Sequence, residues 1–405
     1  MRAISGAAVP AISAILIVCS AAGILLETAY RTNSTVEAAF CRFRICDTGA
    51  VIGRARAARL EPGPEAAARG WQESAEALRR DPAFAYRWCD AGESLSILGE
   101  TEKAASAFRR AVELAPAAPP VLLRAAGFQW RAGRPPEAVA LSSRILQLVR
   151  DYDSVVFLSY TRSGLSTADL LRSAIPPGPA AAQSFFEYSL ARHDTARAAA
   201  LWPWIVERGY TGQRLAARYV DFLLAGRLYP EAAAAWTSFA GKPAGDNLVF
   251  NGGFEREFSG ARLDWTFSPA AHAAETRDPQ NARSGHSSLR VQFDGAANLD
   301  YRGVWQFAVV TPGAYRLQAW AKASGITSDR GVALRVFDPD SPSRLDARTA
   351  ALTGSGDWVP LQAEFEVRPE TGLVQLQLCR EPSWKFDNKL AGTIWIDDVE
   401  LIRTR

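Results

Sequence analysis

The chain has 405 residues, of which 48% are hydrophobic and 22% are charged, a composition that is typical of folded globular domains and excludes a disordered chain. Its formal net charge is only +3, which is too small to indicate a nucleic-acid-binding surface. The length predicts two or three domains.

The first segment, residues 1–26, contains an uncharged run of 24 residues from Ala3 to Leu26. A helix needs about 20 apolar residues to cross a membrane, so this segment is predicted to be a transmembrane anchor. Arg2 precedes the run and favours a cytoplasmic N-terminus, which places the bulk of the chain in the periplasm or otherwise outside the cytoplasm. The alternative is a cleaved signal peptide and a secreted protein.

The arginine and lysine counts, 41 and 5, together with abundant alanine, indicate the coding bias of a GC-rich bacterial genome. A single-pass protein of the bacterial inner membrane is therefore expected. The connecting segment 27–64 contains Cys41 and Cys46, which either close a disulfide in an oxidising compartment or remain thiols. Cys89 and Cys379 lie in apolar patterns and are predicted to be buried.

A helical pattern with an internal repeat extends over residues 65–240. The interval from Gly99 to Gly133 is the same as the interval from Trp202 to Trp236. One unit of the pattern is defined by small and aromatic residues at fixed positions: Trp88, Gly92, Leu95, Gly99, Ala104, Phe108, Ala111 and Pro116. This segment resembles a tetratricopeptide array of four or five helix pairs, which implies a solenoid that binds a protein partner.

The repeat residues are interpreted as packing residues. Small side chains such as Gly92 and Ala104 let paired helices approach, and Phe108 fills the space between repeats. Gly99, Gly133 and Gly226 are predicted to end helices in the left-handed conformation. Residues 241–245 form a short Gly/Pro hinge.

Residues 246–405 change to short alternating runs separated by turn residues. Leu317, Ala319 and Ala321 alternate with polar neighbours, as do Leu376 and Leu378. Period-2 alternation places one side of a strand in a core and the other toward water. The fold class is therefore α then β: a helical solenoid followed by an antiparallel β-sandwich, with the N-terminal transmembrane helix.

This C-terminal region resembles the galactose-binding-like jelly rolls, which include many bacterial carbohydrate-binding modules. The resemblance rests on Asn251-Gly-Gly-Phe-Glu255, Asp264-Trp265, Ser284–Leu289, Pro312–Lys322, Trp358 and Trp395–Leu401. One departure is the insertion from Glu381 to Gly392, which precedes the last strand.

The resemblance implies a glycan site on one sheet face. Sugars stack on aromatic planes and bond to amide and guanidinium groups, and the candidate residues of this kind are Gln306, Arg316, Gln318, Trp320, Arg335, Gln375, Gln377 and Trp384. The alternative interpretation is that they form the ordinary polar surface of a sandwich, with Trp320 packed beneath the insertion.

The resemblance also implies a structural calcium ion. Glu255 and one of Asp397 and Asp398 match the positions that supply oxygens, and calcium takes six to eight of them. The alternative is that these acids cap turns or accept hydrogen bonds from backbone amides.

The sequence has no phosphate-binding loop, no dinucleotide fingerprint and no nucleophile elbow. The expected function is therefore non-enzymatic: a membrane-anchored, extracytoplasmic binding protein whose jelly roll holds an envelope polysaccharide, in polysaccharide assembly or export. The first alternative is a protein–protein scaffold in which the sandwich caps the helical array. A glycoside hydrolase using Asp264, Glu381 or Asp387 ranks third.

Overall fold

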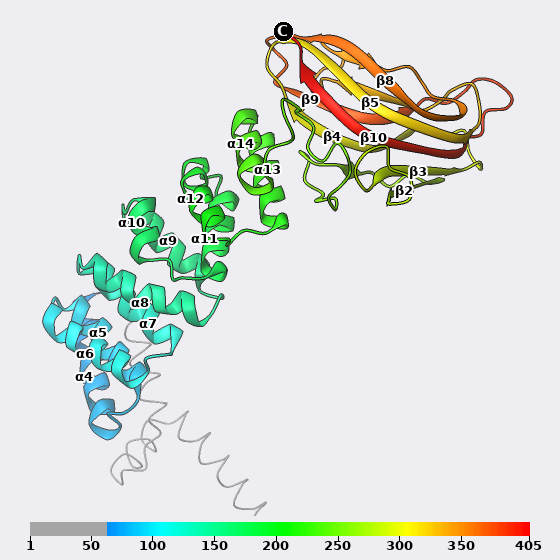
Figure 1. The fold of residues 1–405 in the computed structure, drawn as a ribbon. Coiled ribbons are helices and arrows are strands. Elements are labelled where there is room, and N and C mark those ends of the chain that lie inside the picture. Colours follow the sequence, from blue (N-terminus) through cyan, green and yellow to red (C-terminus); the bar gives the residue numbers. More distant parts are fainter. Residues whose placement is uncertain (1–62) are drawn as a thin grey trace, which may run out of the picture. The chain divides into compact units, whose positions relative to one another are not determined.

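The computed structural model describes residues 63–405, which contain eleven α-helices followed by two five-stranded sheets (Figure 1). The chain folds into two compact units, and the boundary between them lies between Pro176 and Pro177. The first unit contains the helices α4 (Pro64–Arg80), α5 (Ala85–Ile97), α6 (Thr101–Leu114), α7 (Pro119–Arg131), α8 (Pro135–Leu148), α9 (Asp153–Arg162) and α10 (Thr167–Ser173).

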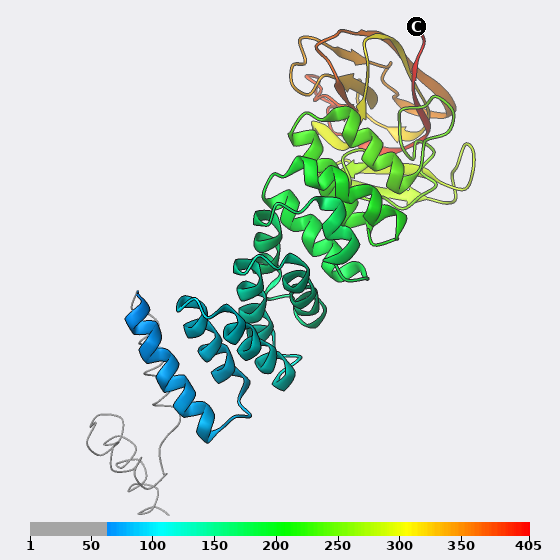
Figure 2. The ribbon, with the colours of Figure 1, turned by 90° about the vertical axis from the view of Figure 1, so that its left-hand side faces the viewer.

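Helices of the first unit form consecutive pairs. The interval from the start of α5 to the start of α7 equals the interval from Gly99 to Gly133, as the sequence repeat predicts. The α5–α6 and α7–α8 pairs lie side by side (Figures 1 and 2). Within the α5–α6 pair, Gly92 lets the two helices approach closely, because a Cβ atom there would lie 2.8 Å from the Phe108 ring. Leu95, Ala104, Phe108 and Ala111 are buried in the same cluster, which confirms their predicted packing role.

The second unit begins with α11 (Pro179–Ala191), α12 (Thr195–Glu207), α13 (Gln213–Ala225) and α14 (Tyr229–Ala240). The same interval returns here, between the starts of α11 and α13. Gly99 and Gly133 have the predicted positive φ, but Gly226 does not, with φ −81°. The left-handed residue after α13 is Arg227, so the prediction for Gly226 was wrong by one position.

The sandwich has two sheets with the strand orders β1-β4-β9-β6-β7 and β2-β3-β10-β5-β8, and every pairing is antiparallel. The strands are β1 (Thr266–Phe267), β2 (Ala273–Asp278), β3 (Ser288–Asp294), β4 (Tyr301–Val309), β5 (Gly313–Ile326), β6 (Ala333–Phe337), β7 (Asp346–Arg348), β8 (Gly354–Val367), β9 (Leu373–Arg380) and β10 (Ala391–Arg403).

Alternating residues of both sheets fill one core between the layers. Leu317, Ala319 and Ala321 of β5 are buried, as are Leu376 and Leu378 of β9, so the alternation predicted the inward side of these strands correctly. Figure 1 shows β5, β8 and β10 in one layer and β4 and β9 in the other.

Helices α13 and α14 contact the sandwich within the second unit. The rings of Trp236 and Phe250 meet edge to face at 5.3 Å, and Tyr229 packs against Gly372, where a Cβ atom would lie 2.8 Å from the Tyr229 ring. Arg256 donates to the backbone oxygen of Ala240 at 2.6 Å. The junction that the sequence presents as a hinge is therefore flanked by specific contacts.

Two further predictions concern the membrane and the cysteines. Among residues 63–405 no helix is long and apolar enough to cross a membrane. The predicted anchor and the pair Cys41 and Cys46 lie outside the described residues. Cys89 and Cys379 are buried, as predicted.

Candidate functional site

The sheet β1-β4-β9-β6-β7 presents a mixed aromatic and polar surface on the side away from the core. Trp305 of β4 is opposite Gln377 of β9, which is opposite Arg335 of β6, which is opposite Arg348 of β7. Cross-strand partners share one face of a sheet, and the neighbouring positions Val304, Leu378 and Leu334 are buried in the core. The row from Trp305 to Arg348 therefore lies on the outer side of this sheet. The sheet β1-β4-β9-β6-β7 is called sheet A below, and its outer side is called the sheet A face.

A second row on the sheet A face joins Phe307, Gln375, Phe337 and Asp346 in the same way. The Trp305 and Phe307 rings lie 5.1 Å apart, and the Trp305 indole N–H donates to the Ser268 hydroxyl at 3.0 Å. These contacts fix a partly exposed aromatic surface beside the partly exposed Gln375. Gln377, on the same side, is buried, and its amide donates to the Arg302 carbonyl at 3.4 Å.

Charged side chains occupy the other end of the rows. Arg335 lies over the Phe337 ring at 4.1 Å and makes two hydrogen bonds of 2.8 Å to Asp346. The bonded Arg335 holds the pKa of Asp346 below its ordinary value. Arg348 is paired with Glu381, and this hydrogen bond lowers the pKa of the Glu381 carboxyl. Both carboxylates are therefore ionised at neutral pH.

A hollow of about 170 Å³ opens at this charged end. Its lining includes the small side chain of Ala333 and the buried Cys379, and burial raises the pKa of the Cys379 thiol. Several of the lining residues are charged; the full lining is Asp329, Arg330, Gly331, Ala333, Arg348, Thr349, Ala351, Cys379, Arg380 and Glu381. At the opposite end, Phe307 and Val309 line a smaller cavity with Trp236 of α14.

Three of the eight residues predicted to bind a glycan share this face: Arg335, Gln375 and Gln377. Gln306 is the first correction, because it is fully buried on the opposite side of β4. Its amide donates to the Phe250 carbonyl at 3.1 Å and accepts from the Phe250 N–H at 3.2 Å. It therefore tethers the segment before β1 and is not accessible to a ligand.

Arg316, Gln318 and Trp320 are the second correction, because all three belong to β5 in the other sheet. They cannot share a face with Gln377. The Trp320 ring is also covered on one side by the guanidinium group of Arg283, 3.9 Å from the ring centre. Arg283 thus covers one side of the Trp320 ring.

Trp384 projects from the insertion and is 95% exposed, and its neighbour Phe386 is also fully exposed. The base of the insertion is fixed: Ser383 donates to Asp329 at 2.5 Å, and Arg380 donates to the Asn388 carbonyl at 3.0 Å. Because Asp329 lines the hollow, Trp384 stands beside the charged end of the sheet A face without covering it.

Sequence reasoning missed the aromatic residues Trp305, Phe307 and Phe337 and the charged residue Arg348. A signal for two of them was present, since Trp305 and Phe307 alternate with Val304 and Gln306 in β4. Polar Gln306 was assigned to the outer side, which reversed the strand. Placing the two aromatic residues on the outward side would have found the site.

The acids predicted to bind calcium act as hydrogen-bond acceptors. Asp397 accepts from the backbone N–H of Arg283 at 2.8 Å and of Ser284 at 3.2 Å, while Asp398 accepts from the Arg283 guanidinium at 2.6 Å. Glu255 accepts from the backbone N–H of His286 at 2.8 Å. The bonds of Asp397 and Asp398 hold the loop before β3 against β10, and the Glu255 bond ties the same loop to the segment before β1.

These donors make a poor environment for a cation, since a guanidinium group already occupies Asp398. In the described part of the chain, no three His, Cys, Asp or Glu side chains gather as metal ligands. The arrangement fits the alternative role of backbone acceptors, and calcium binding stays a prediction.

The carboxylates considered for hydrolysis are spread over different environments. Asp264 is fully buried and accepts from Ser259 and from the backbone N–H of Trp265. Asp387 lies in the exposed insertion, and Glu381 is paired with Arg348. Asp264 is thereby occupied in holding a turn.

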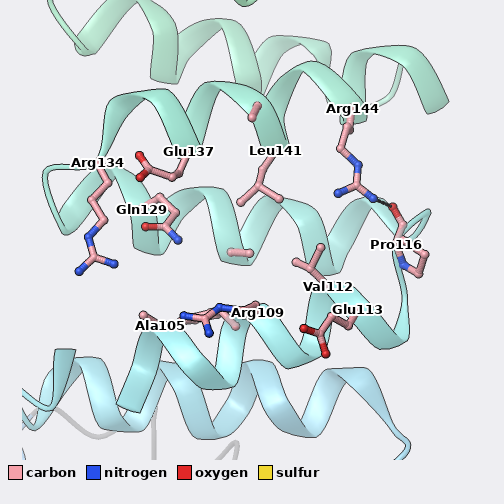
Figure 3. Close-up of a pocket in the computed structure, with 13 residues that line it drawn as sticks. Ala105, Arg109, Val112, Glu113, Pro116, Gln129, Arg134, Glu137, Leu141 and Arg144 are labelled. Atoms are coloured by element: carbon pink, nitrogen blue, oxygen red, sulfur yellow. Dashed lines mark hydrogen bonds between the residues drawn. The ribbon is translucent and has the colours of Figure 1, made fainter. Parts of the chain in front are cut away.

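A second candidate site is a groove of about 600 Å³ in the first unit (Figure 3). It lies between α6 and α8, with α7 beneath, and its apolar surface includes Val112 and Leu141. Arg109 and Gln129 extend along it, and the Gln129 carbonyl oxygen is buried without a hydrogen-bond partner among the described residues. A groove of this size is in the range of ligand sites, and its residues belong to the predicted protein-binding repeats.

No family model matches the chain, and no curated protein matches it. Solved structures resemble its C-terminal part. TmCBM61 in complex with beta-1,4-galactotriose is 21% identical, with 39% of this chain and 99% of that chain covered and a TM-score of 0.27. The CBM22-1 xylan-binding domain of Paenibacillus barcinonensis Xyn10C is 17% identical, with 40% and 98% covered and a TM-score of 0.30.

Proposed function

We propose that the sandwich binds a glycan on the sheet A face and that the helical units bind a protein partner. The protein is then a non-enzymatic binding protein, held outside the cytoplasm by residues 1–26, which serves polysaccharide assembly or export. The observation that carries the proposal is the row from Trp305 through Gln377 and Arg335 to Arg348.

The chemistry of this face suits a sugar. A pyranose ring offers C–H groups to an aromatic plane and pairs of hydroxyls to planar polar groups. Trp305 supplies the plane, and its orientation is fixed by Ser268. Gln375 and Arg335 supply adjacent amide and guanidinium groups, and Asp346 already holds Arg335 in place. Little side-chain entropy is therefore lost at Trp305 and Arg335 on binding.

Affinity electrophoresis of the full chain in gels that contain envelope polysaccharides tests the proposal. Trp305→Ala should weaken binding roughly three- to tenfold, because an aromatic contact contributes about 0.5–1.5 kcal/mol. Trp320→Ala, on the other sheet, is the matched control and should bind normally. Equal loss of affinity in both variants would contradict the site. So would a failure of both the wild type and the control to be retained by any polysaccharide.

A second function is supported by the contacts of α14, in which the sandwich caps the helical array and both parts bind protein. The Trp236–Phe250 contact and the Tyr229–Gly372 contact favour it.

The proposed protein partner is tested at the groove between α6 and α8. Leu141→Glu should abolish co-purification of a partner that wild-type protein retains, while Ile97→Glu, at an exposed apolar position on α5, should not. Loss of the partner with the control alone would place the partner elsewhere.

A further inference from the structure

The charged end of the sheet A face holds more cations than its carboxylates neutralise. Arg330 and Arg348 line the hollow directly. Arg335 is beside Arg348 in the row. Arg302 is near enough to both Cys379 and Glu381 for its charge to favour their ionised forms. Two guanidinium groups therefore line the Cys379–Glu381 corner, with those of Arg335 and Arg302 nearby.

The carboxylates near these groups are already shared. Asp346 is paired with Arg335 at 2.8 Å and with Arg348 at 3.6 Å. Glu381 is paired with Arg348. Neither forms an ion pair with Arg330, although the charge of Arg330 helps to lower the pKa of Glu381. The Arg330 guanidinium group is exposed and has no hydrogen bond or ion pair among the described residues. Two carboxylates, Asp346 and Glu381, thus face three guanidinium groups here. These belong to Arg330, Arg335 and Arg348.

Other nearby groups do not remove this excess. Arg302 is paired with Asp300 at 3.1 Å, but its Nη1 atom is buried with no hydrogen-bond partner in the described structure. Asp329 accepts from Ser383 and is 3.4 Å from Lys385. The buried Arg380 adds a further positive charge. Its guanidinium group donates only to neutral acceptors, which are the side chains of Asn298 and Ser328 and the backbone carbonyls of Leu299, Arg330 and Asn388.

We propose that the glycan bound on this face is anionic, a polysaccharide that carries carboxylate or sulfate groups. The oxyanion enters the hollow and accepts hydrogen bonds from Arg330 and Arg348, while a ring of the same chain stacks on Trp305. Guanidinium groups suit this task because their forked donors match two oxygens of one anion. The small side chains of Ala333 and Cys379 leave the necessary room.

The inference rests on the proposed glycan function and adds the charge of the ligand. Its test compares polymers that share a backbone and differ in charge. Polygalacturonate is compared with its fully methyl-esterified form, and dextran sulfate with dextran, by affinity electrophoresis of the full chain. The first pair tests a carboxylate and the second a sulfate ester, so the two sources of the oxyanion are distinguished.

Wild-type protein should bind at least one charged polymer at least tenfold more tightly than its neutral form, and added salt should weaken that binding. Arg330→Gln should lose roughly three- to tenfold in affinity for the charged polymer. Arg316→Gln removes the same charge from β5 in the other sheet and should retain wild-type affinity. Arg330 is exposed, so this variant should keep the wild-type melting temperature.

Three results would overturn the inference in different ways. Equal, salt-insensitive binding of charged and neutral polymers would refute the anionic ligand and leave the glycan function intact. Equal losses in Arg330→Gln and Arg316→Gln would show attraction by overall charge and refute the hollow as the site. Binding of no polymer, charged or neutral, would refute both the inference and the proposed function.

Discussion

Gln306 shows, at the scale of single residues, that a polar side chain can be a structural group. Its amide pairs with both backbone groups of Phe250. Gln306→Leu should leave that buried N–H and carbonyl without partners, at a cost of about 1–3 kcal/mol each. Urea denaturation should show this loss in the free energy of unfolding. Gln375→Leu, on the partly exposed side, should cost much less; equal costs would contradict the assignment.

Asp397 gives a second prediction at this scale. Burial raises the pKa of its carboxyl to about 6, above the value of about 3.9 in an unfolded chain. The folded state therefore holds this proton more tightly, and the resulting stability is complete below about pH 4 and lost as the pH rises through about 6. The difference in melting temperature between the wild type and Asp397→Asn should therefore shift in favour of the wild type when the pH is lowered from 7 to 5.

The same measurement tests calcium. An ion bound to ionised Asp397 would raise the melting temperature at pH 7 when calcium is added, and it would reverse the pH trend because protons would compete with the metal. A melting temperature that calcium and chelator leave unchanged would leave Asp397 as an acceptor for the loop that contains Arg283.

The insertion illustrates the scale of the element, because a buried side chain helps to anchor it. Arg380 is 1% exposed and donates to Asn388 of the insertion as well as to Arg330 and Leu299. Arg380→Met should leave several buried carbonyls unpaired and release the loop. A lysine-specific protease should then cut at Lys385 and Lys389 faster than in wild type. Trp384→Ala, at an exposed position, is the control and should be cut at the wild-type rate.

The elements also show what the sequence could predict. Helix pairs and inward strand positions were predictable because packing imposes a constant repeat length on the pairs and strict alternation on the strands, as Phe108 and Leu376 illustrate. The sheet to which each strand belongs was not, because strand order depends on pairings between distant segments such as β4 and β9. For that reason Trp320 was grouped with Gln377, although their strands are in different sheets.

For the second unit as a whole, the prediction concerns its junction. Residues 241–245 are flanked by the contacts of Trp236 with Phe250 and of Arg256 with Ala240. Wild-type protein should therefore resist limited proteolysis there. Trp236→Ala should open the junction to cleavage, since it removes a large aromatic contact. Cleavage of the wild type at the rate of the variant would show that the contacts do not hold.

The Trp236–Phe250 contact has a mechanical consequence. A polymer pulled away from the sandwich would load α14 through these packed rings before the short segment beside them could straighten. Below the force that separates the rings, the junction would be rigid and would transmit the load directly. Above that force, residues 241–245 would extend as a flexible linker. Stretching single molecules would show the difference as one early extension step, which Trp236→Ala should remove.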